Sequence, residues 1–241
     1  MIQNVRELPV AVNVCEQVLR EVEKQSAWSM AHVIMNPRAA SLPHKHEAMT
    51  EIYVVTKGYG EFESGALGMV KERYPVVAGS VHEIQGASHM LRNKSAGHLE
   101  HLVFVFPPFD PGNVHLLQEK YVEARARSLF LPEVQDCFDG AKILSYVFPR
   151  LDMSIAFGWV INDPDRRKHP HYHKKITEWV FVVEGRGSVR LNGQTLPIES
   201  GDWIRINPAT EHALINESPE DLVVVCACSP MFQTEDVHYL R

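Results

Sequence analysis

The chain has 241 residues, of which 45% are hydrophobic and 22% are charged, and its formal net charge is −6. This is an ordinary composition for a globular protein with a sizeable apolar core. The acidic balance and the lack of a basic stripe argue against nucleic-acid binding, and no run of about 18 apolar residues predicts a membrane span. The first residues lack the basic and apolar regions of a signal peptide, and the four cysteines form no CxxC pair. We therefore expect a reduced, cytoplasmic protein.

Short β-rich runs, separated by turn residues, follow one another along the chain. Residues 52–55 (Ile-Tyr-Val-Val) and 179–183 (Trp-Val-Phe-Val-Val) are typical strands, and each is soon followed by a glycine. Residues 188–191 lead through Asn-Gly, a hairpin signal, into 194–196, and 222–226 form a further apolar run. This spacing favours antiparallel sandwiches or barrels over alternating βα units.

Most of the sequence is written twice. Three patterns recur in the same order, at offsets of 127, 123 and 123 residues. They are His-x-His-x-x-x-x-Glu at 44–51 and 171–178, His-x-x-x-Asn at 89–93 and 212–216, and a segment ending in Val-His at 106–115 and 229–238. Ordered blocks at nearly constant offset indicate a tandem duplication.

The duplication predicts two domains and a connection. We assign residues 1–117 to an N-terminal domain, 118–135 to a linker and 136–241 to a C-terminal domain. We expect the linker to be partly helical, within a helical segment near 113–129. Pairing two barrels in one chain would bury exposed sheet edges, so we expect an intramolecular pseudo-dimer, with homo-oligomers as a further option.

The His-x-His pattern carries metal chemistry. Side chains two apart on a strand project to the same side, so two imidazoles converge, and a Glu just past a turn can join them. A distant strand would supply a third imidazole. Three nitrogens and one carboxylate suit Fe, Mn, Ni, Cu, Co or Zn, and are too nitrogen-rich for Ca or Mg. The predicted ligands are His44, His46, Glu51 and His89 in the first copy and His171, His173, Glu178 and His212 in the second.

These blocks resemble the two motifs of the cupin family, and the chain as a whole resembles a bicupin. The matching residues are His44, His46, Glu51, Gly58, Gly79, Gly86, His89 and Asn93, then His171, His173, Glu178, Gly185, Gly201, His212 and Asn216. The resemblance implies an all-β chain of two tandem double-stranded β-helix (jelly-roll) barrels, each with a metal and a substrate cavity. Pro37 and Asp165 stand near an expected glycine, and Ala209 replaces another. These departures concern turns, not ligands.

The resemblance implies up to two divalent transition metals (Fe, Mn, Ni or Zn) and a small-molecule substrate. We favour a metal-dependent oxidoreductase with dioxygenase-type chemistry on a small oxygenated molecule. In it Glu51 or Glu178, both predicted ligands, could also serve as catalytic bases. The second copy matches the family pattern more tightly, which favours it as the more active site.

Two alternatives remain. One is a non-redox isomerase or epimerase of sugars or sugar phosphates, or a lyase; phosphate would be bound by Arg166, Arg167, Lys168, Lys174 and Lys175. The other is a non-catalytic module that binds a small ligand. We treat His82, His98, His101 and His169 as non-ligands, and His115 and His238 as structural.

Overall fold

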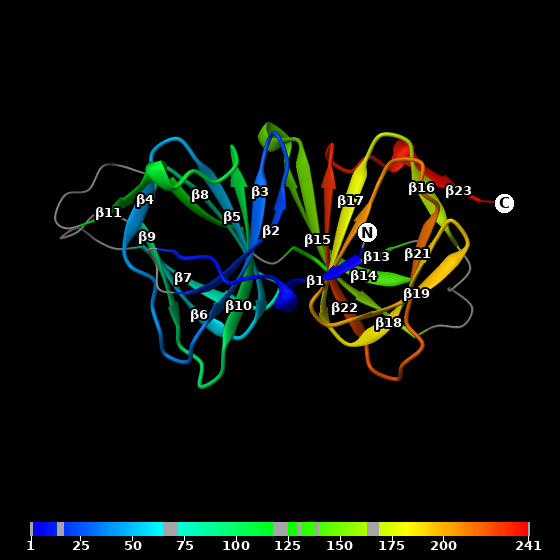
Figure 1. Cartoon of the computed structure of the whole chain (residues 1–241), viewed down its shortest axis with the longest axis horizontal. Coiled ribbons are helices and arrows are strands. Elements are labelled where there is room, and N and C mark those ends of the chain that lie inside the picture. The colour runs from blue at the N-terminus through cyan, green and yellow to red at the C-terminus, as the bar shows by residue number, and fades with distance from the viewer. Residues whose placement is uncertain are drawn as a thin grey trace. The chain divides into compact units, whose positions relative to one another are not determined.

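The computed structural model describes residues 2–13, 17–64, 72–117, 132–137, 140–162 and 169–240, together with the backbone of 125–129. These residues form two compact units (Figure 1). The N-terminal unit is Glu7–Leu131, and the C-terminal unit combines Met1–Arg6 with Pro132–Arg241. Within the described part of the chain, no helix has the length and apolar character needed to cross a bilayer.

The N-terminal unit is built from two antiparallel sheets. The first has six strands in the order β12-β8-β5-β10-β3-β2, and the second has five in the order β11-β4-β9-β6-β7. Their bounds are β2 Val18–Lys24, β3 Ser29–Met35, β4 His44–His46, β5 Thr50–Lys57, β6 Tyr59–Ser64, β7 Glu72–Val77, β8 Val81–Gln85, β9 His89–Asn93, β10 Leu99–Phe106, β11 Val114–Leu116 and β12 Arg125–Leu129. A 3-10 turn, η2 (Pro111–Asn113), precedes β11.

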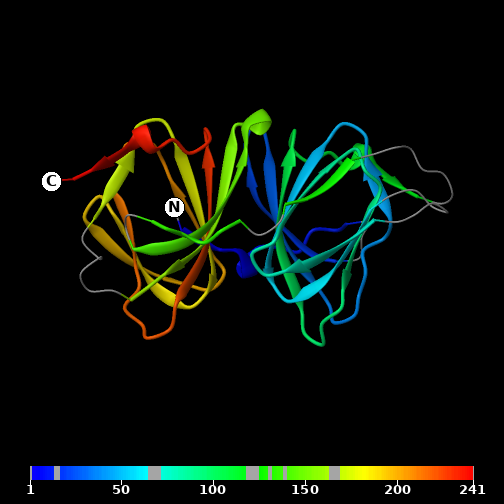
Figure 2. The same ribbon diagram turned by 180° about the vertical axis from the view of Figure 1, so that it is seen from behind.

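The C-terminal unit repeats this plan. Its sheets run β1-β20-β17-β22-β15-β14-β13 and β19-β18-β21-β16-β23. The strands are β1 Ile2–Asn4, β13 Gln135–Asp136, β14 Ala141–Phe148, β15 Met153–Val160, β16 His171–His173, β17 Thr177–Glu184, β18 Arg186–Leu191, β19 Gln194–Glu199, β20 Asp202–Ile206, β21 His212–Ile215, β22 Leu222–Ser229 and β23 Val237–Tyr239. The 3-10 turns are η1 Val5–Glu7, η3 Pro149–Leu151 and η4 Thr234–Asp236. Seen from behind, the sheets of each unit curve around their own interior (Figure 2). The predicted all-β fold of two tandem barrels is confirmed.

The prediction of a helix near 113–129 is wrong for the residues that the structure describes. β11 pairs with β4, and β12 pairs with β8 from Arg125↔Gln85 to Leu129↔Val81. The exposed edge of a sheet offers a row of backbone donors and acceptors, and pairing with it outweighs helix propensity. The rest of the predicted linker, residues 118–124 and 130–131, lies outside the described residues.

The predicted N-terminal domain, 1–117, also needs correction at its start. β1 pairs with β20 of the C-terminal unit, in the register Ile2↔Ile204 to Asn4↔Asp202. The backbone N–H of Val5 extends this contact by donating to Gly201 O at 2.8 Å. A three-residue strand carries no sequence signal for the edge it joins, since its partner is about 200 residues away.

The register shows which positions of the two units correspond. In the N-terminal unit β5 pairs with β10 so that Glu51 lies opposite Val105. In the C-terminal unit β17 pairs with β22 so that Glu178 lies opposite Cys228. The same offsets appear along both pairs of strands, so each interior position of one barrel can be compared with its counterpart in the other.

Motif glycines and asparagines shape the turns that bring these strands together. Gly58 and Gly185 have φ of +84° and +89°, and a Cβ on either would lie 2.6–2.7 Å from a backbone carbonyl oxygen. Only glycine fits such a position. Asn93 and Asn216 donate from their side-chain amides to backbone carbonyls of neighbouring segments at 2.8–3.2 Å. The asparagine of the motif therefore stabilises the turn that follows it in both units.

Apolar side chains fill the interior of each barrel. The N-terminal core includes Val33, Val55 and Phe62, and the C-terminal core includes Val182 and Val224. The alternation of side chains along each strand points one set inward, so the residues two apart that carry the metal motif face the same interior.

Candidate metal centres

The four predicted ligands of the first copy lie together inside the N-terminal barrel. His44 and His46 come from β4, Glu51 from the second residue of β5, and His89 from the first residue of β9. One ligating atom from each residue lies within 4.8 Å of the others. All four side chains are buried. Strand alternation brings His44 and His46 to one side, and the antiparallel pair His44↔His89 adds the third ring.

Hydrogen bonds from the Nδ1 atoms hold the His44 and His89 rings in their orientations. Nδ1 of His44 donates to Leu42 O at 2.8 Å, and Nδ1 of His89 donates to Ala87 O at 2.9 Å. Each bond sets the tautomer, with the proton on Nδ1 and the lone pair on Nε2, as in metal-ligating histidines. Nε2 of His89 then lies 3.1 Å from Glu51 Oε2.

The charge state of the cluster suits metal binding. Burial, together with the neighbouring His89, lowers the pKa of His44 to about 3, so this ring is neutral at ordinary pH. Burial alone would raise the pKa of Glu51, but its contacts with the His46 and His89 rings hold it well below its usual range. His44 and Glu51 are thus in the protonation states that a metal requires.

The second cluster repeats the first inside the C-terminal barrel. His171 and His173 lie on β16, Glu178 on β17 and His212 on β21, again with ligating atoms within 4.8 Å. Nε2 of His212 lies 3.0 Å from Glu178 Oε2, and Nε2 of His173 lies 3.7 Å from the same atom. Burial lowers the pKa of His171 to about 4, and the histidine rings hold that of Glu178 well below its usual range against the opposing effect of burial.

Both clusters fit a divalent transition metal. Nε2 of His46 is buried, lies 3.2 Å from Glu51 Oε2 and yet has no hydrogen-bond partner among the described residues. Leaving such an atom unsatisfied is costly unless something else binds it. Three imidazoles and one carboxylate, with one ligand atom of each within 4.8 Å of the others, match the donor set of such an ion, whose bonds to these ligands are about 2.0–2.2 Å long. The eight predicted ligands are thus brought together as two sets of four.

Asp236 is a positioning residue that the sequence reasoning missed. Its carboxylate accepts hydrogen bonds from the backbone N–H groups of Lys174, Lys175 and Ile176 at 3.0–3.2 Å, and its backbone carbonyl accepts from His173 Nδ1 at 3.2 Å. It therefore holds the turn between the His-x-His strand and Glu178. Its counterpart in the first unit is Asn113, whose side-chain oxygen accepts hydrogen bonds from the backbone N–H groups of Glu47 and Ala48 in the equivalent turn. The recurring segment before the second Val-His was the available signal.

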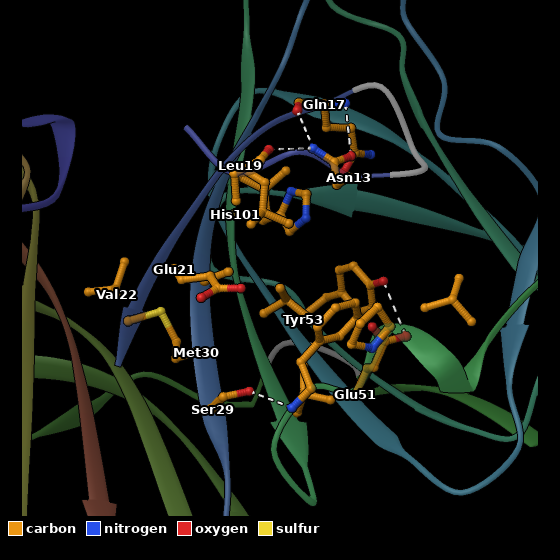
Figure 3. Close-up of a pocket in the computed structure, with 18 of the residues that line it drawn as sticks. Asn13, Gln17, Leu19, Glu21, Val22, Ser29, Met30, Glu51, Tyr53 and His101 are labelled. Atoms are coloured by element: carbon orange, nitrogen blue, oxygen red, sulfur yellow. Dashed lines mark hydrogen bonds between the residues drawn. The ribbon is translucent and has the colours of Figure 1, made fainter. Parts of the chain in front are cut away.

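A cavity of about 360 Å³ opens onto the N-terminal cluster (Figure 3). Its described lining includes three of the ligands, His44, His46 and Glu51, together with Tyr53 and His101. The remaining wall is largely apolar and comes from β2, β3, β9 and β10, with Leu19, Met30, Ala31, Val33, Leu91, Val103 and Val105. The cavity gives a small molecule access to the N-terminal cluster.

Tyr53 and His101 distinguish the two interiors. The Tyr53 hydroxyl donates to Glu51 Oε2 at 3.3 Å and lies 3.2 Å from His89 Nε2. His101, which the sequence reasoning set aside, is only 1% exposed, and its ring centroid lies 5.3 Å from that of Tyr53. The signal for His101 was a histidine at an inward position of a strand that is apolar apart from Glu100.

The same positions in the C-terminal barrel are aliphatic. His101 pairs with Val55, whereas Val224 pairs with Val182 at the equivalent register. The residue that corresponds to Tyr53 is Val180, which belongs to the C-terminal core. The fold therefore does not require polar side chains at these positions.

Cys228 lies beside the C-terminal cluster, opposite Glu178 on the neighbouring strand. Burial, and then the negative charge of Glu178, raises the pKa of its thiol well above the usual range. A thiol held in its protonated form is a poor ligand and nucleophile. The described cysteines, Cys137, Cys226 and Cys228, form no disulfide with one another.

The remaining sequence predictions fall outside the centres. Arg166, Arg167 and Lys168, proposed for phosphate, lie outside the described residues, and Lys174 and Lys175 are exposed. His169 and His98 are exposed. His115 and His238 lie on the short strands β11 and β23, where the His238 ring stacks on Tyr172.

Comparison with known proteins agrees with this architecture. Residues 158–228 match the family model described as cupin domain. An oxalate decarboxylase of Lactobacillus farciminis, solved as a formate complex, superposes with a TM-score of 0.71 over 100% of this chain and 88% of that one, at 16% identity. The chain has a bicupin fold. A 7S globulin of Momordica charantia aligns with this chain at a TM-score of 0.70 and 14% identity, over 95% of this chain and 84% of that one.

Two curated relatives match shorter stretches of the chain. A protein of Streptomyces cyaneus named polyketide synthase CurC is 35% identical over 74 residues, 31% of this chain and 48% of the relative. An uncharacterized protein of Methanocaldococcus jannaschii is 32% identical over 71 residues, 30% of this chain and 57% of the relative. The matches thus span about half the length of each relative, and the solved structures, at this identity, share the fold alone.

Proposed function

We propose that this bicupin is a metal-dependent oxidoreductase that carries out dioxygenase-type oxidation of a small oxygenated molecule in its N-terminal barrel. One observation carries the proposal. The His44, His46 and Glu51 side chains face a largely apolar cavity that is large enough for a small molecule. Cavities of this kind, with a few convergent polar groups, are the usual form of small-molecule sites.

The metal would be held by His44, His46, Glu51 and His89, with a second ion in the C-terminal cluster. When bound, a redox-active ion such as Fe or Mn would join O₂ chemistry to an oxygenated substrate, because four protein ligands leave two positions open on an octahedral ion. Zn or Ni in the same cluster would favour Lewis-acid chemistry.

The chain's own residues would prepare the substrate. Tyr53 orients the Glu51 carboxylate through its hydroxyl, and so holds the cluster in one arrangement. Glu51 is the one buried carboxylate among the described lining residues, which supports a role for it in accepting a proton from an enol or catechol hydroxyl. The apolar wall excludes water, which strengthens these interactions.

The alternatives are weaker on the described residues. A sugar phosphate needs cationic partners, and no buried Lys or Arg lines the described cavity. Similarity to an oxalate decarboxylase at 16% identity concerns the fold and does not select a lyase. In a protein that only binds a small ligand, the metal in the cluster would stabilise the barrel and take no part in a reaction.

The first experiment is metal analysis by elemental mass spectrometry on tag-free protein purified without chelators. We expect two equivalents per chain, and one in each of two double variants, His44→Ala/His46→Ala and His171→Ala/His173→Ala. O₂ uptake by Fe- or Mn-loaded protein is then measured across enols, diketones and polyphenols.

Uptake should be lost in the N-terminal double variant and kept in the C-terminal one, which serves as its matched control. Loss in the C-terminal variant alone would move the reaction to that barrel. No uptake by fully loaded protein across the panel would overturn the oxidoreductase. Zinc as the native metal would shift the weight to isomerase or lyase chemistry.

A further inference from the structure

His101 is a buried polar side chain that the barrel does not satisfy. It lies on β10, is 1% exposed and lines the cavity (Figure 3). Its Nδ1 has no hydrogen-bond partner among the described residues. Burial lowers the pKa of His101 to about 3, so the ring is neutral and offers one donor and one acceptor. An unsatisfied group in an apolar wall is costly, and a bound molecule could supply the missing partner.

The charges around the cavity argue against an anionic ligand. Glu21 pairs with Ala31, and Leu19 pairs with Val33, so Glu21 shares the inward face of β2 with the cavity wall. The charged lining residues outside the cluster are Glu21, Glu23 and Lys24, and both Glu21 and Lys24 are exposed. A metal in the cluster would compensate the negative charge of a ligand only where ligand atoms bind the metal itself. A carboxylate or phosphate elsewhere in the cavity would face Glu21 and Glu23, with the exposed Lys24 as the one cation among the described lining residues.

The C-terminal barrel provides an internal comparison. Val224 occupies the register of His101, and the fold forms equally well around it. A histidine that costs stability, where its duplicate has valine, points to a role in ligand recognition.

We propose that the N-terminal cavity takes an uncharged, mainly apolar substrate, and that His101 determines specificity by hydrogen bonding to a polar group of that substrate away from the metal cluster. The inference rests on the proposed function in placing the substrate in the N-terminal barrel. The binding preference it describes is independent of oxidation, so the two can fail separately.

Three catechols test this selectivity. Protocatechualdehyde carries a neutral acceptor on the ring, methylcatechol has a methyl group there, and protocatechuate has a carboxylate. Binding to Zn-loaded protein is measured by titration calorimetry, because zinc prevents turnover. We expect the aldehyde to bind about fivefold more tightly than methylcatechol, the effect of one neutral hydrogen bond, and about tenfold more tightly than protocatechuate.

Substitutions then assign the preference to His101. His101→Val, which copies the duplicate, should remove the preference for the aldehyde over methylcatechol, and His101→Gln, which keeps a donor and an acceptor, should retain most of it. His82→Ile is the matched control, because His82 is a buried histidine of the same sheet that does not line the described cavity. It should leave the ratio within about twofold.

The inference is overturned if protocatechuate binds as tightly as the aldehyde, if no catechol binds, or if the ratio survives His101→Val or is lost equally in His82→Ile. If His101→Val does not fold, the comparison of His101→Gln with His101→Leu decides. The proposed oxidation is judged separately, from O₂ uptake by Fe-loaded protein. Selective binding without uptake would refute the oxidation and leave the assignment of His101 standing.

Discussion

His82 should make the stability of the N-terminal unit depend on pH. The residue lies on β8, is 1% exposed and stacks on Phe62 with ring centroids 5.6 Å apart. Its Nε2 lies 3.3 Å from the Ser80 hydroxyl. Ile204 occupies the equivalent position in the C-terminal barrel, since it pairs with Val180 as His82 pairs with Tyr53. We therefore consider the variant His82→Ile.

The size of the effect follows from the pKa. Burial lowers the pKa of His82 from 6.5 to about 4. Between these values the unfolded chain binds a proton that the folded chain does not, so stability falls as the pH decreases. The contribution of neutral His82 is complete above about pH 6.5 and is lost progressively towards pH 4. At about pH 5 the loss is about 2 kcal/mol, since one pKa unit corresponds to about 1.4 kcal/mol.

Isoleucine does not titrate, so the stability of His82→Ile relative to wild type should rise by about 2 kcal/mol between about pH 7.5 and pH 5. Urea unfolding, followed by the fluorescence of the buried Trp28 in the same unit, measures this difference, and comparing two proteins at each pH cancels the pH dependence of metal binding. His98→Gln is the control, because His98 is exposed. A difference that stays flat with pH, that reverses, or that also appears in His98→Gln would refute the reasoning.

Three further predictions concern turns and the cluster. Ala209 has φ of +62° where the first unit has Gly86 at +63°, so Ala209→Gly should raise the free energy of unfolding, and Gly86→Ala should lower it, by about 1 kcal/mol in chemical denaturation; equal effects of the same sign would contradict this. Gly185→Ala should cost more than about 2 kcal/mol, because its Cβ would lie 2.7 Å from a carbonyl oxygen, whereas Gly193→Ala, with nothing within 4 Å, should cost about 1 kcal/mol; similar midpoints for the two would argue against steric clash. Tyr53→Phe should weaken metal binding in the N-terminal cluster alone by about tenfold in competition with a chelator, and unchanged affinity would show that its hydroxyl does not hold the carboxylate.

Local patterns predicted an all-β chain and both ligand sets, and the resemblance to the cupin motifs added the two jelly-roll barrels. Side-chain alternation on a strand makes His44 and His46 neighbours whatever the rest of the chain does, and the repeat at 171–178 made an accidental pattern implausible. Asn192-Gly193 predicted a hairpin, and the structure has φ of +47° and +82° there. Such signals are read within a few residues.

Only the tertiary structure decided what lies across from what. The register of β5 and β10 brings His101 to the cavity wall, and no spacing along the chain shows this, because the two strands are joined by more than 40 residues. The same holds for β1, whose three residues join β20 through backbone hydrogen bonds that carry no side-chain signature, and for β12, which pairs with an edge that the sequence does not mark. Metal ligands can be recognised in a sequence because coordination demands particular residue types at particular intervals. A cavity wall does not, because its shape and polarity arise from strands that meet only when the barrel closes.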